Sequence, residues 1–216
     1  MRLWLFVALT LAALAAGCST AAVVPPQAPP PRTEVLTSLM ANTESVDRVR
    51  VNENAWLKTY PISAEGGLNA IRRQLDAIGP RSEVSGQRFD ALTSWALRWS
   101  FSYNDSQGSC SIRNATIDVE AVITLPVLDQ PESLPPGELD AWQAYVEKLR
   151  AHEDGHVNLY LIAARELRDE YLQFGSMSDC RTLAAALAAR GEAKIEAIHS
   201  RDRAYDAQTG HGAIFP

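Results

Sequence analysis

Five consecutive residues in the carboxyl-terminal half of the chain could do chemistry: His152-Glu153-Asp154-Gly155-His156, an H-E-x-x-H sequence. On an α-helix, residues four positions apart lie on one face, about 6 Å apart along the axis, so both imidazoles can reach one cation. Neutral imidazoles suit Zn²⁺, and a neighbouring carboxylate can take a proton from a zinc-bound water. The expected chemistry is hydrolysis of an amide bond, with Glu153 as the general base.

Two histidines leave a catalytic zinc site short of one protein ligand. The metzincin extension needs Gly and His at fixed steps after His156, and this chain lacks both. We predict that the third ligand is His211, because glycines on both sides of it give the backbone freedom to reach the metal. The alternatives are Asp206 in the same tail and Glu192 or Glu196 in the segment before it.

Two further tail residues are expected to act around the metal. The oxyanion that develops during hydrolysis needs a second hydrogen-bond donor, and Tyr205 is the candidate, with a buried structural tyrosine as the alternative. Asp206 is expected beside the ligands, where a carboxylate orients a ligand imidazole or fixes the tail by hydrogen bonds.

The H-E-x-x-H sequence belongs to a long helical pattern. Apolar residues recur at three- and four-residue steps from about Gly137 to Gly175, and both histidines fall on their stripe. Polar groups on a core-facing stripe need partners, which a shared metal supplies. A second helix, rich in alanine, is expected over about 179–204.

The preceding segment mixes strands with one helix. Ser63 can cap that helix and Gly79-Pro80 ends it. Residues 93–103 and 117–125 alternate between apolar and polar, which predicts an antiparallel hairpin that Pro126 ends. Trp95 and Trp99 are expected in the core, although their face could also line a substrate groove. The predicted fold is therefore α+β: an antiparallel sheet, an active-site helix carrying H-E-x-x-H and a second carboxyl-terminal helix.

The amino terminus predicts export. One basic residue and an uncharged stretch from Leu3 to Ala16 are typical of a signal peptide and too short to span a bilayer. The residues Leu14-Ala15-Ala16-Gly17-Cys18 resemble a bacterial lipobox, although ordinary signal peptidase could cleave here. The expected division is a lipoprotein signal peptide over 1–17, a Pro-rich tether over 18–44 that begins with lipidated Cys18, and one domain over 45–216.

Cysteine content and charge bound the function further. If Cys18 carries lipid, Cys110 and Cys180 remain in an oxidising compartment, where a disulfide is the expected pairing and two separate buried thiols are the alternative. Without Arg2 the chain has 19 basic and 26 acidic residues, a net charge of −7. This balance argues against nucleic-acid partners.

Motifs along the chain resemble a bacterial family of predicted secreted zinc-dependent proteases, long catalogued only as a domain of unknown function. The resemblance covers about Glu53 to Gly212 and implies a zincin fold and an active-site role for the tail motif. The matching positions are Gly79-Pro80, Thr93-x-Trp95, Trp99, Cys110, Thr124-Leu125-Pro126, Trp142, His152-Glu153-x-Gly155-His156, Cys180 and Tyr205-Asp206-x-x-Thr209-x-His211-Gly212.

We therefore expect a Zn²⁺-dependent endopeptidase of the bacterial cell envelope. It would be anchored through Cys18, with an outer-membrane address facing the periplasm, and would act on a protein or peptide substrate. One alternative is a metallohydrolase directed at peptidoglycan cross-bridges. The other is a non-catalytic lipoprotein in which four protein ligands would close a structural zinc site.

Overall fold

The computed structural model describes residues 36–212 and 215–216. The predicted signal peptide, Cys18 and residues 19–35 of the tether lie outside the described residues. The strands are β1 (Thr37–Val46), β2 (Val49–Ser63), β3 (Leu92–Ser106) and β4 (Ser109–Asp129). The helices are α1 (Gly67–Ile78), the short 3-10 helix η1 (Pro131–Ser133), α2 (Pro136–Leu172) and α3 (Cys180–Thr209).

The four strands form one sheet in the order β1-β2-β4-β3. β1 and β2 are antiparallel neighbours, as are β3 and β4, whereas β2 and β4 run parallel. The hairpin predicted from period-two alternation is therefore confirmed, while the parallel β2–β4 pair was not predicted. α1 lies in the connection between β2 and β3.

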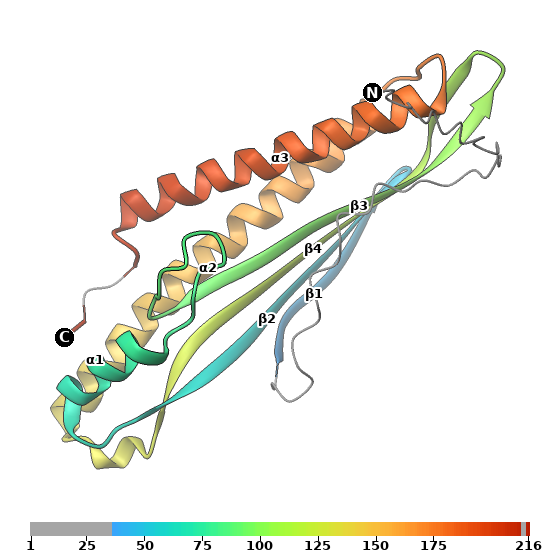
Figure 1. Cartoon of the computed structure of the whole chain (residues 1–216). Coiled ribbons are helices and arrows are strands. Elements are labelled where there is room, and N and C mark those ends of the chain that lie inside the picture. Colours follow the sequence, from blue (N-terminus) through green and yellow to red (C-terminus); the bar gives the residue numbers. More distant parts are fainter. Residues whose placement is uncertain (1–35, 213–214) are drawn as a thin grey trace, which may run out of the picture.

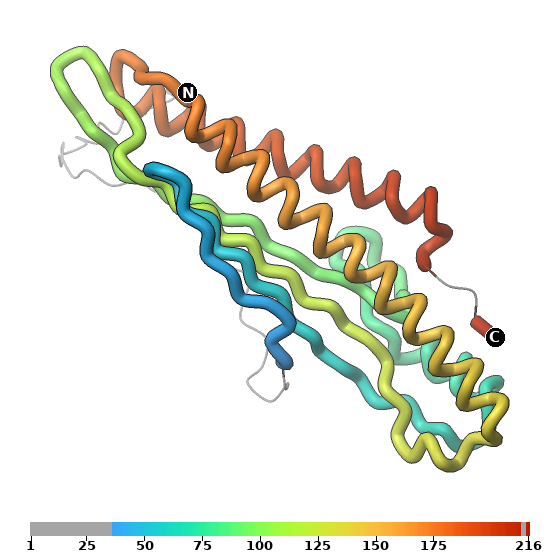
Figure 2. The backbone as a smooth tube through the Cα atoms, turned by 180° about the vertical axis from the view of Figure 1, so that it is seen from behind, coloured from blue at the N-terminus to red at the C-terminus, as the bar shows by residue number. Residues whose placement is uncertain are grey.

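The two long helices cover one face of the twisted sheet (Figures 1 and 2). Both helices run along the length of the strands, and α3 lies on the side of β3. Alternate residues of β4, including Ile117, Val119, Ala121 and Ile123, are fully buried beneath α2. This arrangement confirms the α+β class, with helices on one face of a mainly antiparallel sheet.

Three predicted boundaries before α2 were wrong. β1 begins at Thr37, so the sheet includes residues that had been assigned to the tether. Gly66, not Ser63, precedes α1, because Ser63 is the last residue of β2. β4 continues through Pro126, which lies beyond the last β3 pair, Leu92 with Thr124, so that its missing N–H removes no hydrogen bond to β3.

The first residues of α3 agree with the sequence prediction, but its carboxyl-terminal end lies further along the chain than predicted. Asp179 caps it by accepting a hydrogen bond from the Thr182 backbone N–H at 2.9 Å. The helix then continues past the predicted end at residue 204 and stops at Thr209, where Gly210 adopts a left-handed conformation. Tyr205 and Asp206 therefore lie on a helix.

The predicted disulfide is present and links Cys110 of β4 to Cys180, the first residue of α3. It fastens the turn between α2 and α3 to the β3–β4 hairpin, where Cys110 and Met177 also exchange two backbone hydrogen bonds. Among the described helices, none combines the length and the apolar character needed to cross a bilayer.

Candidate metal centre

The H-E-x-x-H residues lie in the middle of α2 and face the interior. His152, Glu153 and His156 are 6%, 4% and 7% exposed, so each polar side chain needs a partner inside the protein. α2 packs this face against β3 and against the last turns of α3, and both neighbours supply polar side chains. The prediction that both histidines belong to the buried stripe of the helix is confirmed.

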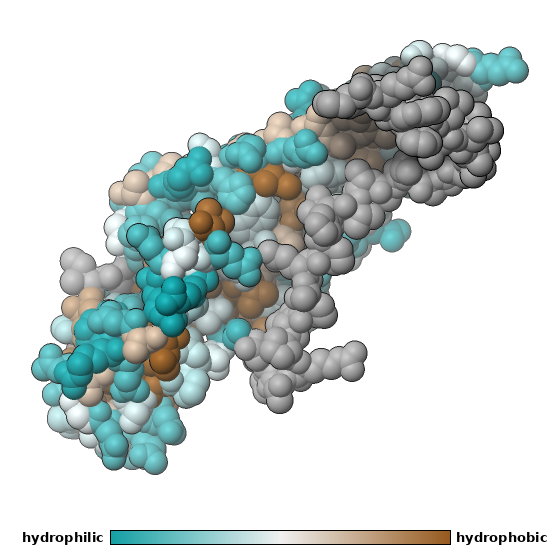
Figure 3. Space-filling model, in the orientation of Figure 1, coloured by the Kyte–Doolittle hydropathy of each residue, from teal (hydrophilic) through white to brown (hydrophobic). Residues whose placement is uncertain are grey.

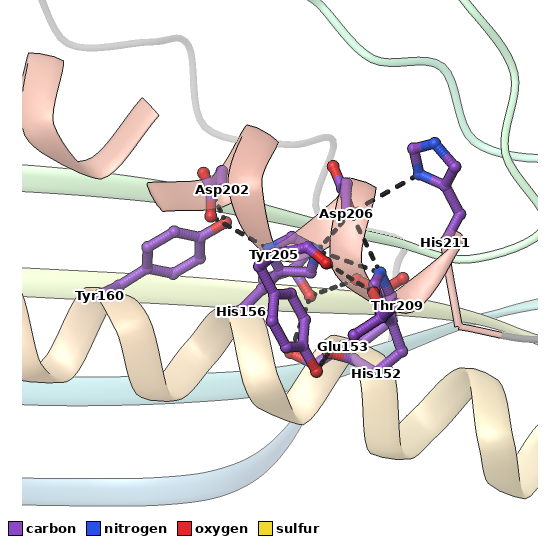
Figure 4. Close-up of polar contacts among 10 residues, drawn as sticks. His152, Glu153, His156, Tyr160, Asp202, Tyr205, Asp206, Thr209 and His211 are labelled. Atoms are coloured by element: carbon purple, nitrogen blue, oxygen red, sulfur yellow. Dashed lines mark hydrogen bonds and ion pairs between the residues drawn. The ribbon is translucent and has the colours of Figure 1, made fainter. Parts of the chain in front are cut away.

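Three ligand atoms converge between α2 and α3 (Figure 4). His152 Nε2 and His156 Nε2 are 3.1 Å apart, and Asp206 Oδ1 lies 3.2 Å from the first and 3.1 Å from the second. Ligand atoms of a tetrahedral zinc site, with metal–nitrogen bonds of about 2.0–2.1 Å, are separated by about 3.3 Å. The triangle therefore has the size that a tetrahedral zinc requires of three of its four ligands.

The tautomer of His156 follows from its second partner. Its Nδ1 lies 3.0 Å from Asp202 Oδ1, and an ionised carboxylate only accepts hydrogen bonds. The proton of a neutral His156 therefore sits on Nδ1, and Nε2 presents a lone pair to the triangle. Tyr160 donates a hydrogen bond from its hydroxyl to Asp202 Oδ2 at 3.2 Å, which fixes that carboxylate in turn.

The same reasoning applies to His152. Its Nδ1 lies 3.1 Å from Thr209 Oγ1, and the single hydroxyl proton of Thr209 is donated to the backbone oxygen of Tyr205 at 2.7 Å. Thr209 Oγ1 must therefore accept a hydrogen bond from His152 Nδ1–H. The Nε2 atom of His152 also presents a lone pair.

The triangle thus consists of three hydrogen-bond acceptors that face one another. Two imidazole lone pairs and a carboxylate oxygen at these distances repel unless a cation lies between them or one ring takes up a second proton. Among the described residues this is the group of three His, Cys, Asp or Glu side chains close enough to hold a metal. The Asp206 side chain is 30% exposed, compared with 5% for His152 and 9% for His156, so Asp206 is the most exposed corner of the triangle.

Burial and neighbouring carboxylates act differently on the two rings. Burial and the adjacent His156 lower the pKa of His152, although Asp206 opposes them. Burial would also lower the pKa of His156, but the hydrogen bond to Asp202 and the surrounding carboxylates outweigh it and raise the pKa. In the absence of a metal, His156 is therefore the ring that takes up the second proton more readily.

Glu153 is held from the opposite side by the sheet. Thr93 of β3 donates a hydrogen bond from Oγ1 to Glu153 Oε2 at 2.7 Å, in a contact buried from solvent. Burial raises the pKa of the Glu153 carboxyl, while the Thr93 hydrogen bond lowers it. A carboxylate with a raised pKa and a fixed orientation suits a general base that must take up and then return a proton.

Gly155 makes room for Tyr205. A Cβ atom at position 155 would lie only 2.0 Å from the Tyr205 hydroxyl oxygen. The Tyr205 ring stacks on His152 with centroids 5.0 Å apart, and its hydroxyl donates to the His152 backbone oxygen at 3.3 Å. The structure thus gives Tyr205 a positioning contact to α2, and its predicted role as an oxyanion donor stays a prediction.

Gly212 also packs against His152. Its φ of 91° is in the left-handed region, and a Cβ there would lie 2.6 Å from the Cβ of His152. The tail motif therefore surrounds the His152 imidazole: Tyr205 stacks on it, Thr209 Oγ1 accepts a hydrogen bond from its Nδ1–H, and Gly212 packs against the His152 Cβ.

The structure places Asp206, not His211, at the third corner of the triangle. His211 lies on the outer side of Asp206, with Nδ1 3.5 Å from Oδ1 and a side chain that is 61% exposed (Figure 4). The reason is the length of α3: Asp206 is still helical and faces α2, whereas the left-handed Gly210 and His211 turn the chain away. Asp206, expected to support the ligands, thus occupies the position predicted for His211.

Sequence reasoning missed three residues of the site: Asp202, Tyr160 and Thr93. Asp202 carried a signal, since it lies four residues before Asp206 and repeats the His152–His156 spacing on the facing helix. That signal was lost because the helix was predicted to end at 204. Thr93 belongs to the Thr93-x-Trp95 motif of the family resemblance, which gave it no role, and Tyr160 follows an ordinary helix pattern.

One comparison with known proteins identifies a family. Residues 57–212 match the family described as "Bacterial protein of unknown function (DUF922)". The chain belongs to this family. The DUF922 match spans the strands β3 and β4, all of α2 and α3, and the whole tail motif, so every residue of the candidate metal centre lies within it. The searches of curated proteins and of solved structures found no match.

Proposed function

We propose that the chain is a zinc-dependent endopeptidase, with His152, His156 and Asp206 as metal ligands and Glu153 as general base. The observation that carries the proposal is the convergence of three lone pairs, at separations of 3.1–3.2 Å, beside a buried glutamate. Three protein ligands leave one of four tetrahedral positions open, which is the arrangement of catalytic rather than structural zinc sites.

The chemistry that zinc supplies at such a position is a bound water of lowered pKa and a polarised substrate carbonyl. Glu153 takes the proton of the attacking water at its carboxylate and returns it to the leaving amine. Thr93 holds one carboxylate oxygen, Oε2, through a 2.7 Å hydrogen bond, so the orientation of the base is set by β3. A structural zinc site has no use for a base held in this way.

The remaining side chains position the ligands. Asp202 keeps the proton of His156 on Nδ1 and Thr209 keeps that of His152 on Nδ1, so that both Nε2 atoms stay free to bind metal. Asp206 adds a negative charge, which lowers the net charge of the loaded site compared with three histidines. The predicted signal sequence and the predicted lipidation of Cys18 favour a location at the bacterial cell envelope, tethered through lipid.

The test uses the mature chain loaded with one equivalent of zinc and a denatured, fluorescently labelled protein as substrate. We expect cleavage that a chelator abolishes and that added zinc restores. Glu153→Gln should retain the zinc and the fold while the cleavage rate falls by several orders of magnitude. A Glu153→Gln variant that cleaves as fast as the parent would rule out the general-base role.

Cell-wall zymography run beside this assay separates the peptidoglycan alternative. Cleavage of purified peptidoglycan with no cleavage of denatured protein would replace the endopeptidase proposal by a hydrolase of cross-bridges. Bound zinc with neither activity would favour the non-catalytic lipoprotein.

A further inference from the structure

A groove among the described residues runs along β3, next to the metal centre. It has a volume of about 1130 Å³ and is lined by Leu92–Arg98 of β3 and by two side chains of α3, Ile195 and His199. The other lining residues are Lys58–Pro61 of β2, Thr124 of β4, Ile78 at the end of α1 and the segment 80–84. None of the three metal ligands lines it. Thr93 belongs both to the groove and to the metal centre, because its hydroxyl holds Glu153.

One edge of β3 is available along this groove. β3 is the last strand of the sheet and pairs only with β4 among the described residues, so its second row of backbone N–H and C=O groups has no strand partner there. An exposed sheet edge of this kind accepts an extended peptide as an additional strand. Main-chain hydrogen bonds then supply affinity that does not depend on the peptide sequence.

One face of α3 connects the groove to the metal. Ile195, His199, Asp202 and Asp206 follow one another at steps of four, three and four, so they form a single stripe along the helix. The first two line the groove and the last two belong to the metal centre. A chain lying between β3 and α3 would therefore be led along this stripe toward the ligands.

A side-chain pocket lies one step along β3 from Thr93. Trp95 points to the same side of the strand as Thr93, at a distance of about 6.8 Å for two strand residues. Its indole stacks on Tyr160 with centroids 5.0 Å apart, and His199 lies 5.4 Å from its centre. The half-buried Trp95 and His199 form, together with Ile195, a mainly aromatic and aliphatic wall of the groove.

Where the described residues are visible in Figure 3, separate hydrophobic spots lie between hydrophilic residues. A single extended chain, held by its backbone and by one side chain in the pocket, fits the groove.

We infer that the groove binds the substrate of the proposed peptidase as an extended, unfolded segment added to the edge of β3. The wall formed by Trp95, Ile195 and His199 selects an apolar or aromatic side chain two residues from the bond that faces Glu153. This inference rests on the proposed function, because that bond is cleaved only if the chain is a peptidase. Peptide binding itself can be measured without hydrolysis.

The first experiment measures binding by fluorescence anisotropy on zinc-loaded Glu153→Gln, which would not consume the probe. The probes are fluorescein-labelled nine-residue peptides of Gly, Ser and Thr with one central Phe, each N-methylated at one backbone position. Every second N–H of an added strand points at β3, so methylation should weaken binding by about tenfold at alternate positions only. A flat profile along the peptide would overturn strand addition.

The second experiment tests the pocket. Ile195→Glu should lower the affinity of the Phe peptide by about tenfold and raise that of a peptide with Lys in its place. The matched control is Ala193→Glu, which adds the same charge at an exposed position of α3 and should leave both affinities unchanged. Equal affinities of the parent and Ile195→Glu for the two peptides would refute the role of this wall.

The two proposals fail in different ways. Alternating N-methyl effects in a protein that cleaves no substrate would leave the groove inference standing and reject the peptidase. Zinc-dependent, Glu153-dependent cleavage together with a flat N-methyl profile would support the peptidase and reject strand addition in the groove.

Discussion

Asp206 Oδ1 lies 3.2 Å from His152 Nε2, although the two residues are 54 positions apart and belong to different helices. The contact exists because α3 runs antiparallel to α2 and remains helical through its last turns. The carboxylate thus completes a triangle with both imidazoles, in the place where sequence reasoning expected His211.

The two candidate third ligands make opposite predictions for zinc content. Asp206→Ala removes one corner of the triangle, so we expect the purified variant to lose stoichiometric zinc. His211→Ala removes a side chain outside the triangle, and we expect it to keep about one zinc per chain. Elemental analysis of both proteins after dialysis checks this. Zinc retained by Asp206→Ala and lost by His211→Ala would restore His211 as the ligand.

Asp202 should act on the metal without touching it. Asp202→Asn replaces the acceptor for His156 Nδ1–H by an amide that can donate instead, so the favoured tautomer of His156 is no longer fixed. We expect zinc affinity to fall by about 10–100-fold with little change in thermal stability. Competition with a chelating dye measures it, and an affinity equal to that of the parent would contradict the assigned role.

Two glycines of α2 provide a matched pair of substitutions. Gly155→Ala places a Cβ 2.0 Å from the Tyr205 hydroxyl, so α3 must shift, and we expect a loss of about 1–3 kcal/mol in the free energy of unfolding. Gly137→Ala, near the start of the same helix, meets no atom within 4 Å and should be neutral or stabilising by up to about 1 kcal/mol. Urea unfolding compares them; equal effects would mean that Tyr205 does not pack closely on position 155.

Acid should weaken the fold through Glu53, a fully buried carboxylate on β2. Burial raises its pKa, but hydrogen bonds from Arg165, at 2.6 and 2.8 Å, and from Asn42, at 3.1 Å, outweigh burial and lower the pKa. A pKa that is lower in the folded state gives stability above the unfolded value of about 4.3, and this stability is lost as the pH falls through the folded pKa.

We therefore expect the melting temperature of the parent to fall more steeply below about pH 4.5 than that of Glu53→Gln. Glu53→Gln should itself be less stable at pH 7, because the Arg165 guanidinium loses its charged partner. Glu147→Gln, at an exposed position of α2, serves as the control and should keep the steep slope of the parent. Identical slopes for the parent and Glu53→Gln would show that Glu53 is not the group responsible.

The disulfide should matter for stability and not for the metal. The Cys110–Cys180 bond closes 70 residues of chain, for which the loop-entropy account gives about 4.4 kcal/mol as an upper figure. Cys180 begins α3, whereas Asp206 lies near its other end. Replacing both cysteines by alanine should therefore lower the melting temperature and leave zinc stoichiometry at about one. Loss of zinc from the folded double variant would contradict this separation.

Local patterns predicted the elements that have a clear period. Alternation predicted the hairpin that became β3 and β4, and three- and four-residue steps predicted α2 with both histidines facing inward. Cysteine counting predicted the Cys110–Cys180 disulfide. The strand and helix predictions succeed because buried positions recur every two residues in a strand and every three or four in a helix, and this spacing of apolar residues is visible in the sequence.

The parts that failed depend on tertiary contacts. Residues 205–209 have no apolar stripe, which predicted a tail, yet they are helical and packed against α2, where Tyr205 stacks on His152 and Asp206 contacts the imidazoles of His152 and His156. One extra turn and a half of helix decides whether Asp206 or His211 reaches the triangle. The parallel β2–β4 pair was likewise invisible, since pairing between distant strands leaves no local signal.

The most direct measurement of the metal centre is an anomalous difference map, collected at the zinc absorption edge from crystals of the mature chain grown with zinc. We predict one peak within bonding distance of His152 Nε2, His156 Nε2 and Asp206 Oδ1, with a non-protein ligand at the fourth position. No peak between these atoms, or a fourth protein side chain closing the site, would contradict the account.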